Sequence, residues 1–221
     1  LGRRGGGPGE FQFPVGVMLV GVSLYVRDMM KGGYARFAPD GASVADRRIE
    51  ESLGFVNELR YHRDGVWMSG SIQDSLNSVV GFFADTARST VLHRVSTPRG
   101  RALQFSCVGM SGSTPMFSPN LFWSSAGERA AVHAQPGYEI WVYRNARLEM
   151  SIRRAIPSRA PSIDDAKQLY PEGWKVSFGG ARADCVVPVE EVVAQQGLAP
   201  VLPLVHDVLV LPDGRIIARR S

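Results

Sequence analysis

The 221-residue sequence predicts an all-β fold, a β-propeller of four-stranded antiparallel blades interrupted by a short α-helical insertion. Apolar runs of strand length recur in groups separated by turns, and the first group of four fills about 40 residues, the size of one propeller blade. Residues 33–49 and 137–156 also match each other, because each begins with Gly-Tyr and carries Arg-Arg near its end. A β-sandwich is the alternative architecture, and the blade rhythm favours the propeller.

The first group shows this rhythm most clearly. Its four strand-like runs lie at residues 11–20, 23–28, 34–38 and 42–49. The last two runs are joined by Pro39-Asp40-Gly41, in which proline presets the first turn position and glycine accepts a positive φ. We therefore expect one complete blade here.

Three further groups follow with less even spacing. The second has runs at residues 57–61, 66–71, 79–84 and 90–95, the third at 120–124, 129–133, 139–144 and 148–156, and the fourth at 206–211 and 215–219. A second Pro-Asp-Gly turn, at residues 212–214, joins the two runs of the last group. The chain is therefore expected to hold about three and a half blades.

Residues 157–200 break the strand pattern. Ser162 followed by two aspartates is typical of a helix N-terminus, and Pro188 and Gly197 bracket a second short helix. A segment of this length between blades is either a lid or binding surface, or it packs on the propeller edge. We therefore divide the chain into blades over residues 1–156, a helical insertion over 157–200 and the start of a further blade over 201–221.

Composition and charge argue against a nucleic-acid partner and against a transmembrane helix. The net charge of +4 is mild, and the basic residues occur as scattered pairs instead of a stripe interleaved with aromatic residues. No apolar run reaches the roughly 20 residues that cross a bilayer as a helix. We expect neither a nucleic-acid partner nor a transmembrane span.

The chain contains two cysteines, Cys107 and Cys185, too few for a disulfide scaffold. They either form one disulfide in an oxidising compartment or stay as two buried thiols. The sequence does not decide between these states.

Residues 7–41 resemble the NHL repeat. The matching positions are Gly7-Pro8-Gly9-Glu10-Phe11, Pro14, Gly16-Val17, Leu24-Tyr25-Val26, Asp28, Phe37 and Pro39-Asp40-Gly41. The glycines are expected to shape an interblade loop, Phe11 to pack between blades and Asp28 to form hydrogen bonds in a turn. The sequence departs from the repeat at residues 20–23, which replace its usual Asp-rich turn, and the later groups keep only the hydrophobic rhythm.

The whole chain is similar to bacterial six-bladed propeller proteins of the exported, often lipid-anchored type. This resemblance implies a periplasmic or cell-surface location, a lipid anchor upstream of the sequence and about three and a half of six blades. The exported relatives commonly have no assigned activity, and propellers in general serve both as enzymes and as passive scaffolds.

The candidate site comes from aligning the first strands of the groups on their turns. This alignment places five polar residues at the same level, where the starts of the inner strands would ring one mouth of a central channel: Asn57, Glu58, Asn120, His206 and Asp207. Carboxylates, amides and an imidazole suit a metal ion, such as Ca²⁺ or Zn²⁺, or a cationic ligand. The alternative is that they hydrate the channel or cap strand ends.

No catalytic motif accompanies these residues. The glycines at residues 5–9 lack the Lys-Ser/Thr of a phosphate loop, and neither a Gly-x-Ser-x-Gly elbow nor a His-Glu-x-x-His motif occurs. The leading hypothesis is a non-enzymatic propeller that binds a small molecule or a protein. The alternative is a metal-dependent hydrolase or lyase that acts at the channel mouth.

Overall fold

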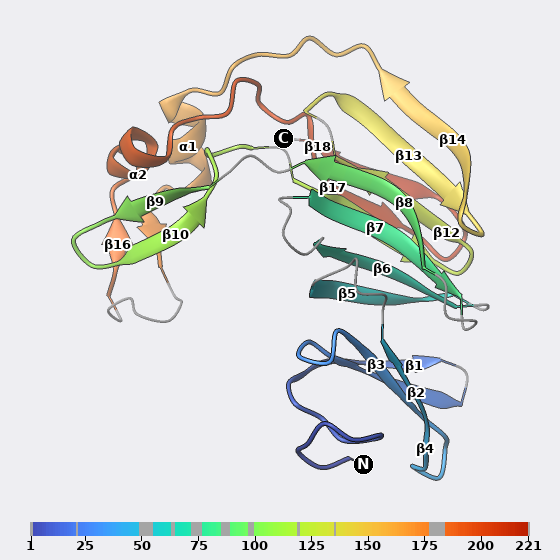
Figure 1. Cartoon of the computed structure of the whole chain (residues 1–221). Coiled ribbons are helices and arrows are strands. Elements are labelled where there is room, and N and C mark those ends of the chain that lie inside the picture. Colours follow the sequence, from blue (N-terminus) through green and yellow to red (C-terminus); the bar gives the residue numbers. More distant parts are fainter. Residues whose placement is uncertain are drawn as a thin grey trace.

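The structure, a computed structural model, consists of stacked β-sheets with a smaller unit of helices and short strands to one side (Figure 1). It describes residues 2–20, 22–48, 55–62, 65–71, 77–84, 89–96, 100–118, 120–134, 136–176 and 184–220.

Three sheets have four antiparallel strands, each paired in chain order. The first sheet contains β1 (Pro14–Val20), β2 (Ser23–Asp28), β3 (Gly33–Phe37) and β4 (Ser43–Arg48). The second contains β5 (Phe55–His62), β6 (Gly65–Ser71), β7 (Asn77–Ala84) and β8 (Ser89–Ser96). The third contains β11 (Phe122–Ala126), β12 (Arg129–His133), β13 (Tyr138–Arg144) and β14 (Arg147–Arg154). A fourth sheet has two strands, β17 (Val205–Val210) and β18 (Ile216–Arg220).

The expected all-β class and the order of strands within each group are confirmed, and the sheets do not close into a ring. Most strand ends differ from the expected runs by one or two residues. The largest difference is at β1, which begins at Pro14 and not at residue 11. The residues before Pro14 form a loop, because the N–H groups of Gln12 and Phe13 donate to the Asp28 carboxylate instead of a neighbouring strand.

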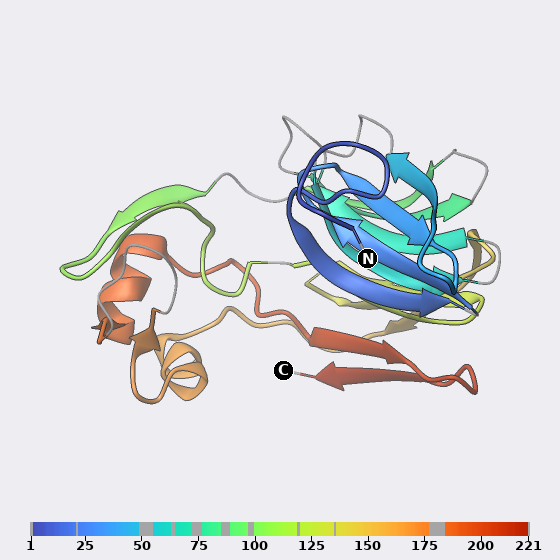
Figure 2. The same ribbon diagram turned by 90° about the horizontal axis from the view of Figure 1, so that it is seen from below.

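The first strands of consecutive sheets lie side by side. β1 contacts β5, β5 contacts β11, and β11 contacts β17. Figures 1 and 2 show the sheets following one another in chain order, with the later strands of each four-stranded sheet running outward. The first strand of each group is therefore an inner strand, as the sequence predicted.

Aromatic side chains fill the space between the second and third sheets. Trp67 is fully buried there, and it packs with Trp123 and Tyr143 in one cluster. The Trp67 indole N–H also donates to the carbonyl of Gly127, at 3.2 Å, so this large side chain is buried with its polar group satisfied. These aromatic residues therefore form the core between the two sheets.

Aliphatic side chains fill the next interface. Ile140 and Val142 of the third sheet pack with Val208 and Val210 of β17. The backbone N–H of Val210 donates to the Ser124 hydroxyl at 3.1 Å. Both faces of the third sheet are therefore covered.

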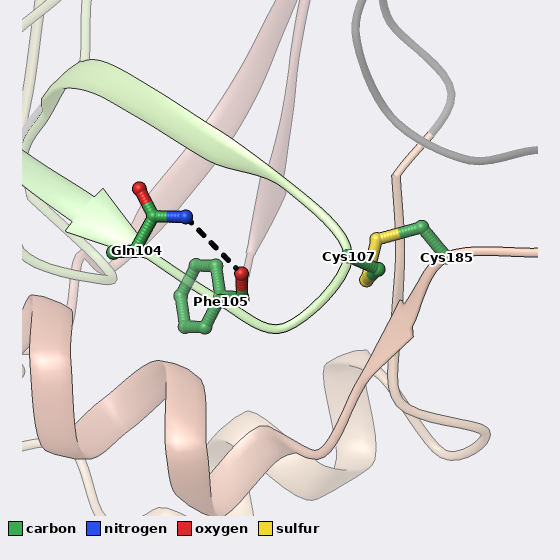
Figure 3. Close-up of a disulfide and its surroundings, with 4 residues drawn as sticks. All are labelled: Gln104, Phe105, Cys107 and Cys185. Atoms are coloured by element: carbon green, nitrogen blue, oxygen red, sulfur yellow. Dashed lines mark hydrogen bonds between the residues drawn. A yellow bond between two sulfur atoms is a disulfide. The ribbon is translucent and has the colours of Figure 1, made fainter.

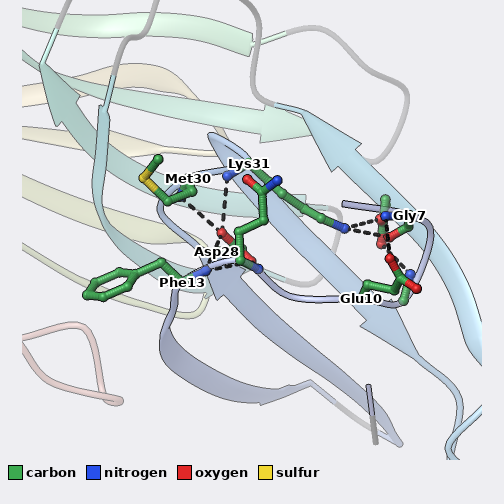
Figure 4. A network of polar contacts seen from close by, with 9 residues as sticks. Gly7, Glu10, Phe13, Asp28, Met30 and Lys31 are labelled. Carbon is green, nitrogen blue, oxygen red and sulfur yellow. Dashed lines mark hydrogen bonds and ion pairs between the residues drawn. The ribbon is translucent and has the colours of Figure 1, made fainter. Parts of the chain in front are cut away.

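The loop before β1 is fixed by polar contacts that explain the NHL-like residues (Figure 4). The buried Asp28 carboxylate accepts from the backbone N–H groups of Gln12, Phe13, Met30 and Lys31, at 2.6 to 3.3 Å. Burial alone would raise the pKa of Asp28, but these N–H groups together lower it below its ordinary value. Asp28 therefore acts as the expected hydrogen-bonding residue of a turn.

The insertion forms a unit with its own core. It contains α1 (Ile163–Leu169), β15 (Trp174–Lys175), β16 (Val186–Val187) and α2 (Val189–Gln196), together with a hairpin from earlier in the chain, β9 (Arg101–Gln104) and β10 (Gly109–Ser113). Ser162 caps α1 in a capping box with Asp165, and Gly197 ends α2, as the sequence predicted.

The β9–β10 hairpin was not predicted, because no strand pattern marks residues 101–113 and they lie far from residue 157 in sequence. A disulfide between Cys107 and Cys185 ties the hairpin to β16 (Figure 3). Leu103 and Phe105 then pack against Val189 and Val192 of α2. Among the described residues, neither helix has the length and apolar character that crossing a bilayer requires.

Candidate functional site

The inner strands share a local irregularity at the end where the candidate residues lie. β1, β5 and β17 each carry an extra residue near their start, at Val15, Asn57 and His206. Such bulges change the direction of a side chain and are frequent beside functional sites. Their recurrence matches the sequence alignment of Asn57 with His206.

The structure brings some of the five predicted residues together. Asn120, just before β11, and His206, at the bulge of β17, line the same cleft. Asp207, which pairs with Arg219 in the strand register, does not line the cleft. Asn57 and Glu58 lie in β5, but their side chains fall outside the described part of the structure.

The cleft has a volume of about 1210 Å³ and lies between the insertion and the starts of β11 and β17. Three of the segments that connect the insertion to the sheets line it, at residues 114–118, 156–159 and 202–204. Figure 2 shows these connections running from the helical unit to the sheet stack.

The connections are hydrogen-bonded to one another. The N–H of Met116 donates to the carbonyl of Gly197 at 2.9 Å, and the N–H of Ala199 donates back to Met116 at 2.8 Å. The N–H of Leu202 donates to the carbonyl of Arg159 at 2.8 Å. These bonds join the connections to one another along the cleft.

The two sides of the cleft differ in chemistry. The sheet side presents the amide of Asn120, the half-buried imidazole of His206 and the guanidinium of Arg220. The insertion side presents apolar and aromatic groups, including Leu169 at the end of α1 and Trp174 of β15. Large apolar walls with a few polar groups are typical of sites that bind organic ligands.

Phe117 contributes a strained segment of the cleft wall. Its φ is 64°, a left-handed backbone conformation that is costly for a bulky side chain. The neighbouring turn, closed by the Ser118 N–H and the Pro115 carbonyl at 3.0 Å, and packing against the insertion core hold it there. Strain of this kind is concentrated at ligand sites, so Phe117 supports the assignment of the cleft as a site.

One ion pair neutralises the outer wall of the cleft. The Arg159 guanidinium contacts both oxygens of Asp165, at 2.6 and 2.5 Å. Hydrogen bonds from Arg159, and then from the N–H and hydroxyl of Ser162, hold the pKa of Asp165 well below its ordinary range. The aspartate is therefore fully ionised and already paired, which leaves it no charge to offer a ligand.

The described residues offer no metal centre. In this part of the chain no three histidine, cysteine, aspartate or glutamate side chains are grouped as metal ligands. His62 and His133 are buried at separate places, and His62 lies at the end of β5.

Of the cleft residues, sequence reasoning predicted Asn120 and His206 as site residues but missed Phe117, Arg159 and Arg220. Phe117 and Arg159 lie in connections without regular structure, which carry no periodic signal. Arg220 belongs to one of several Arg-Arg pairs that look alike in sequence. The pairing of β17 with β18, which sets Arg220 opposite Val205, is what brings it to the cleft.

Comparison with known proteins adds little. No protein-family model and no curated protein matches the chain. Solved structures of Hsv2 match 68% of it. KlHsv2 with loop 6CD replaced by a Gly-Ser linker is 9% identical, with 57% of that chain covered and a TM-score of 0.31. Hsv2 of Kluyveromyces marxianus (12% identity, 56% of that chain, TM-score 0.31) and Kluyveromyces lactis Hsv2 with complete loop 6CD (12% identity, 54% of that chain, TM-score 0.30) match similarly. This chain thus spans a little over half the length of those proteins, and the likeness is too low to support an argument about fold or function.

Proposed function

We propose that this chain is a ligand-binding module of an NHL-like propeller, and that its ligand occupies the cleft between the insertion and the inner strands. The observation that carries the proposal is the cleft of about 1210 Å³, which includes Asn120 and His206. The apolar wall of the cleft, which includes Leu169 and Trp174, and its few polar groups favour the binding of an organic ligand.

The propeller part of the proposal has two supports. Four consecutive sheets place their first strands side by side, and the Asp28 network and the packing of Phe11 on Phe37, at 5.7 Å between ring centres, give the NHL-like residues the roles expected of them. The number of blades in the whole protein, six by resemblance, stays a prediction.

The disulfide supports a location in the bacterial envelope. Disulfides persist in oxidising compartments, such as the periplasm or the cell surface, and are rare in the cytosol. Thiol labelling of the protein inside its native cells tests this proposal. Cys107 and Cys185 should stay unlabelled until a reductant is added, and immediate labelling of both would contradict an envelope location.

The binding function is tested by obstructing the cleft. Gln168, an exposed cleft residue on α1, is replaced by tryptophan to fill the cleft without disturbing the core. Ala194→Trp places the same side chain at an exposed position of α2 outside the cleft and serves as the matched control.

Melting temperatures are then measured with fractions of a small-molecule extract from bacterial envelopes. A fraction that raises the Tm of the native chain and of Ala194→Trp, but not of Gln168→Trp, supports the proposal. If no fraction raises the Tm, or if Gln168→Trp responds like the native chain, the cleft is not a ligand site.

A further inference from the structure

The charges that line the cleft are unbalanced. Among the described lining residues Asp165 is the only carboxylate, and Arg159 already pairs with both of its oxygens. Arg220 is the second guanidinium of the cleft, and no carboxylate of the described residues pairs with it. The cleft therefore carries one uncompensated positive charge on the side formed by the sheets.

Polar groups that suit an anion lie on the same side as Arg220. Val205 pairs directly with Arg220 in the register of β17 and β18, so the guanidinium and the bulged His206 extend from adjacent positions. Asn120 adds an amide at the start of β11. A guanidinium binds carboxylate, sulfonate or phosphate groups through charge-assisted hydrogen bonds, which are stronger than those between neutral groups.

The opposite side of the cleft is largely apolar, and its ion pair between Arg159 and Asp165 has no net charge. Leu169, Trp174 and the strained Phe117 form this wall, and Trp174 is held edge-to-face against Phe105 of the insertion core, with ring centres 6.0 Å apart. A ligand that satisfies both sides needs an apolar or aromatic body and an anionic group at one end.

We propose that the ligand of the cleft is a small amphiphilic organic anion, whose charged group binds Arg220 and whose apolar body lies against Trp174, Leu169 and Phe117. This inference rests on the proposed binding function and adds the chemical class of the ligand. The concave shape of the cleft favours a molecule that enters it over a flat surface that covers it.

Two fluorescent probes that share one skeleton test the proposal. 1-Anilinonaphthalene-8-sulfonate carries a sulfonate, and N-phenyl-1-naphthylamine is its neutral counterpart, so comparing their dissociation constants isolates the contribution of the anion. We expect the sulfonate to bind the native chain about tenfold more tightly, and Arg220→Gln to remove this preference while leaving the neutral probe unaffected.

Arg219→Gln is the matched control, because Arg219 neighbours Arg220 in β18, is equally exposed and does not line the cleft. It should leave both constants unchanged. Exposed apolar residues elsewhere, such as Val17 and Leu19, also attract such probes, so Gln168→Trp and Ala194→Trp identify the share of binding that belongs to the cleft.

The outcomes separate the two proposals. Equal affinity for both probes, or a sulfonate preference that survives in Arg220→Gln, overturns the anionic class but leaves the cleft as a ligand site if Gln168→Trp still abolishes binding. If Gln168→Trp changes the binding of neither probe, both the class and the proposed function fail. Circular dichroism of each variant verifies that the fold is intact.

Discussion

The first and third sheets have the same strand order but different surroundings. Both faces of the third sheet are covered, one by the second sheet and the other by β17 and β18. In the first sheet the strand register puts Val17 and Leu19 of β1 on the same face as the buried Val26 and Phe37, yet Val17 and Leu19 are 69% and 70% exposed. Apolar strand residues are therefore buried here according to the position of their strand in the stack, not according to their hydrophobicity alone.

The first sheet compensates for these exposed side chains of β1 with polar contacts. Its loop network centres on Asp28, and Lys31 links the carbonyl of Gly7, at 2.8 Å, to the carboxylate of Asp46, at 2.7 Å. The third sheet depends instead on packed side chains. The two sheets should therefore respond to different perturbations.

The largest effect is expected at the covered face. Trp67→Ala would leave a cavity between the second and third sheets and an unpaired Gly127 carbonyl, at a cost of about 3–5 kcal/mol in the free energy of unfolding. Phe13→Ala, at a half-exposed position before β1, is the control and should cost well under that. Urea denaturation measures both, and equal costs would show that position in the stack does not matter.

The polar network of the first sheet gives the next largest effect. Asp28→Ala would leave several buried N–H groups without an acceptor, which should cost about 3 kcal/mol. Asp40→Ala removes one exposed hydrogen bond, to Ala42 at 2.9 Å, and is expected to cost below about 1 kcal/mol. A small loss for Asp28→Ala would mean that the loop is held by the packing of Phe11 on Phe37 instead.

The sequence predicted best the features that depend on residues close together in the chain. Turn chemistry is local, so Pro39-Asp40-Gly41, the Ser162 cap and the Gly197 stop placed their elements within a residue or two. The residues that contact Asp28 also lie within 16 positions of it in the sequence, and the repeat pattern predicted its hydrogen-bonding role in a turn.

Long-range contacts could not be predicted in this way. The disulfide joins residues 78 positions apart, and β9–β10 becomes part of the insertion only through it and through packing on α2. The cleft forms where three separate connections meet, so only Asn120 and His206, which sit on regular inner strands or beside them, were predicted as site residues. Arg159 and Phe117 owe their positions to tertiary contacts that leave no local pattern.

The two sheets should also differ in how their contributions to stability depend on pH, and this effect is smaller. Burial lowers the pKa of His133, although its hydrogen bonds to backbone carbonyls, including Glu139 at 2.8 Å, oppose this. Because the folded pKa lies below the ordinary 6.5, stability is complete above pH 6.5 and declines as the pH falls below it. The pKa of Asp28 is also lowered. Its contribution to the free energy of unfolding is therefore complete above its ordinary pKa of 3.8 and is lost only in stronger acid.

Denaturation at pH 7.5, 5.5 and 4.5 measures this difference. The native chain should lose stability between the first two values, and His133→Gln should reduce that loss, leaving the part that comes from His93, whose pKa burial also lowers. Asp28→Asn should leave the slope between pH 7.5 and 5.5 unchanged. A slope that follows Asp28 and not His133 would contradict the assignment of the acid-sensitive contacts to the third sheet.

The smallest effect is expected at the exposed side chains of β1. Val17→Thr keeps the shape of the side chain and adds a hydroxyl that water can hydrate, so it should change the free energy of unfolding by less than about 0.5 kcal/mol. Val142→Thr makes the same change at a fully buried position of the third sheet, where the hydroxyl must be buried, and should cost about 1–3 kcal/mol. If Val17→Thr costs as much as Val142→Thr, the face of β1 is covered in solution, and the covering surface must then be apolar enough to exclude water from Val17 and Leu19.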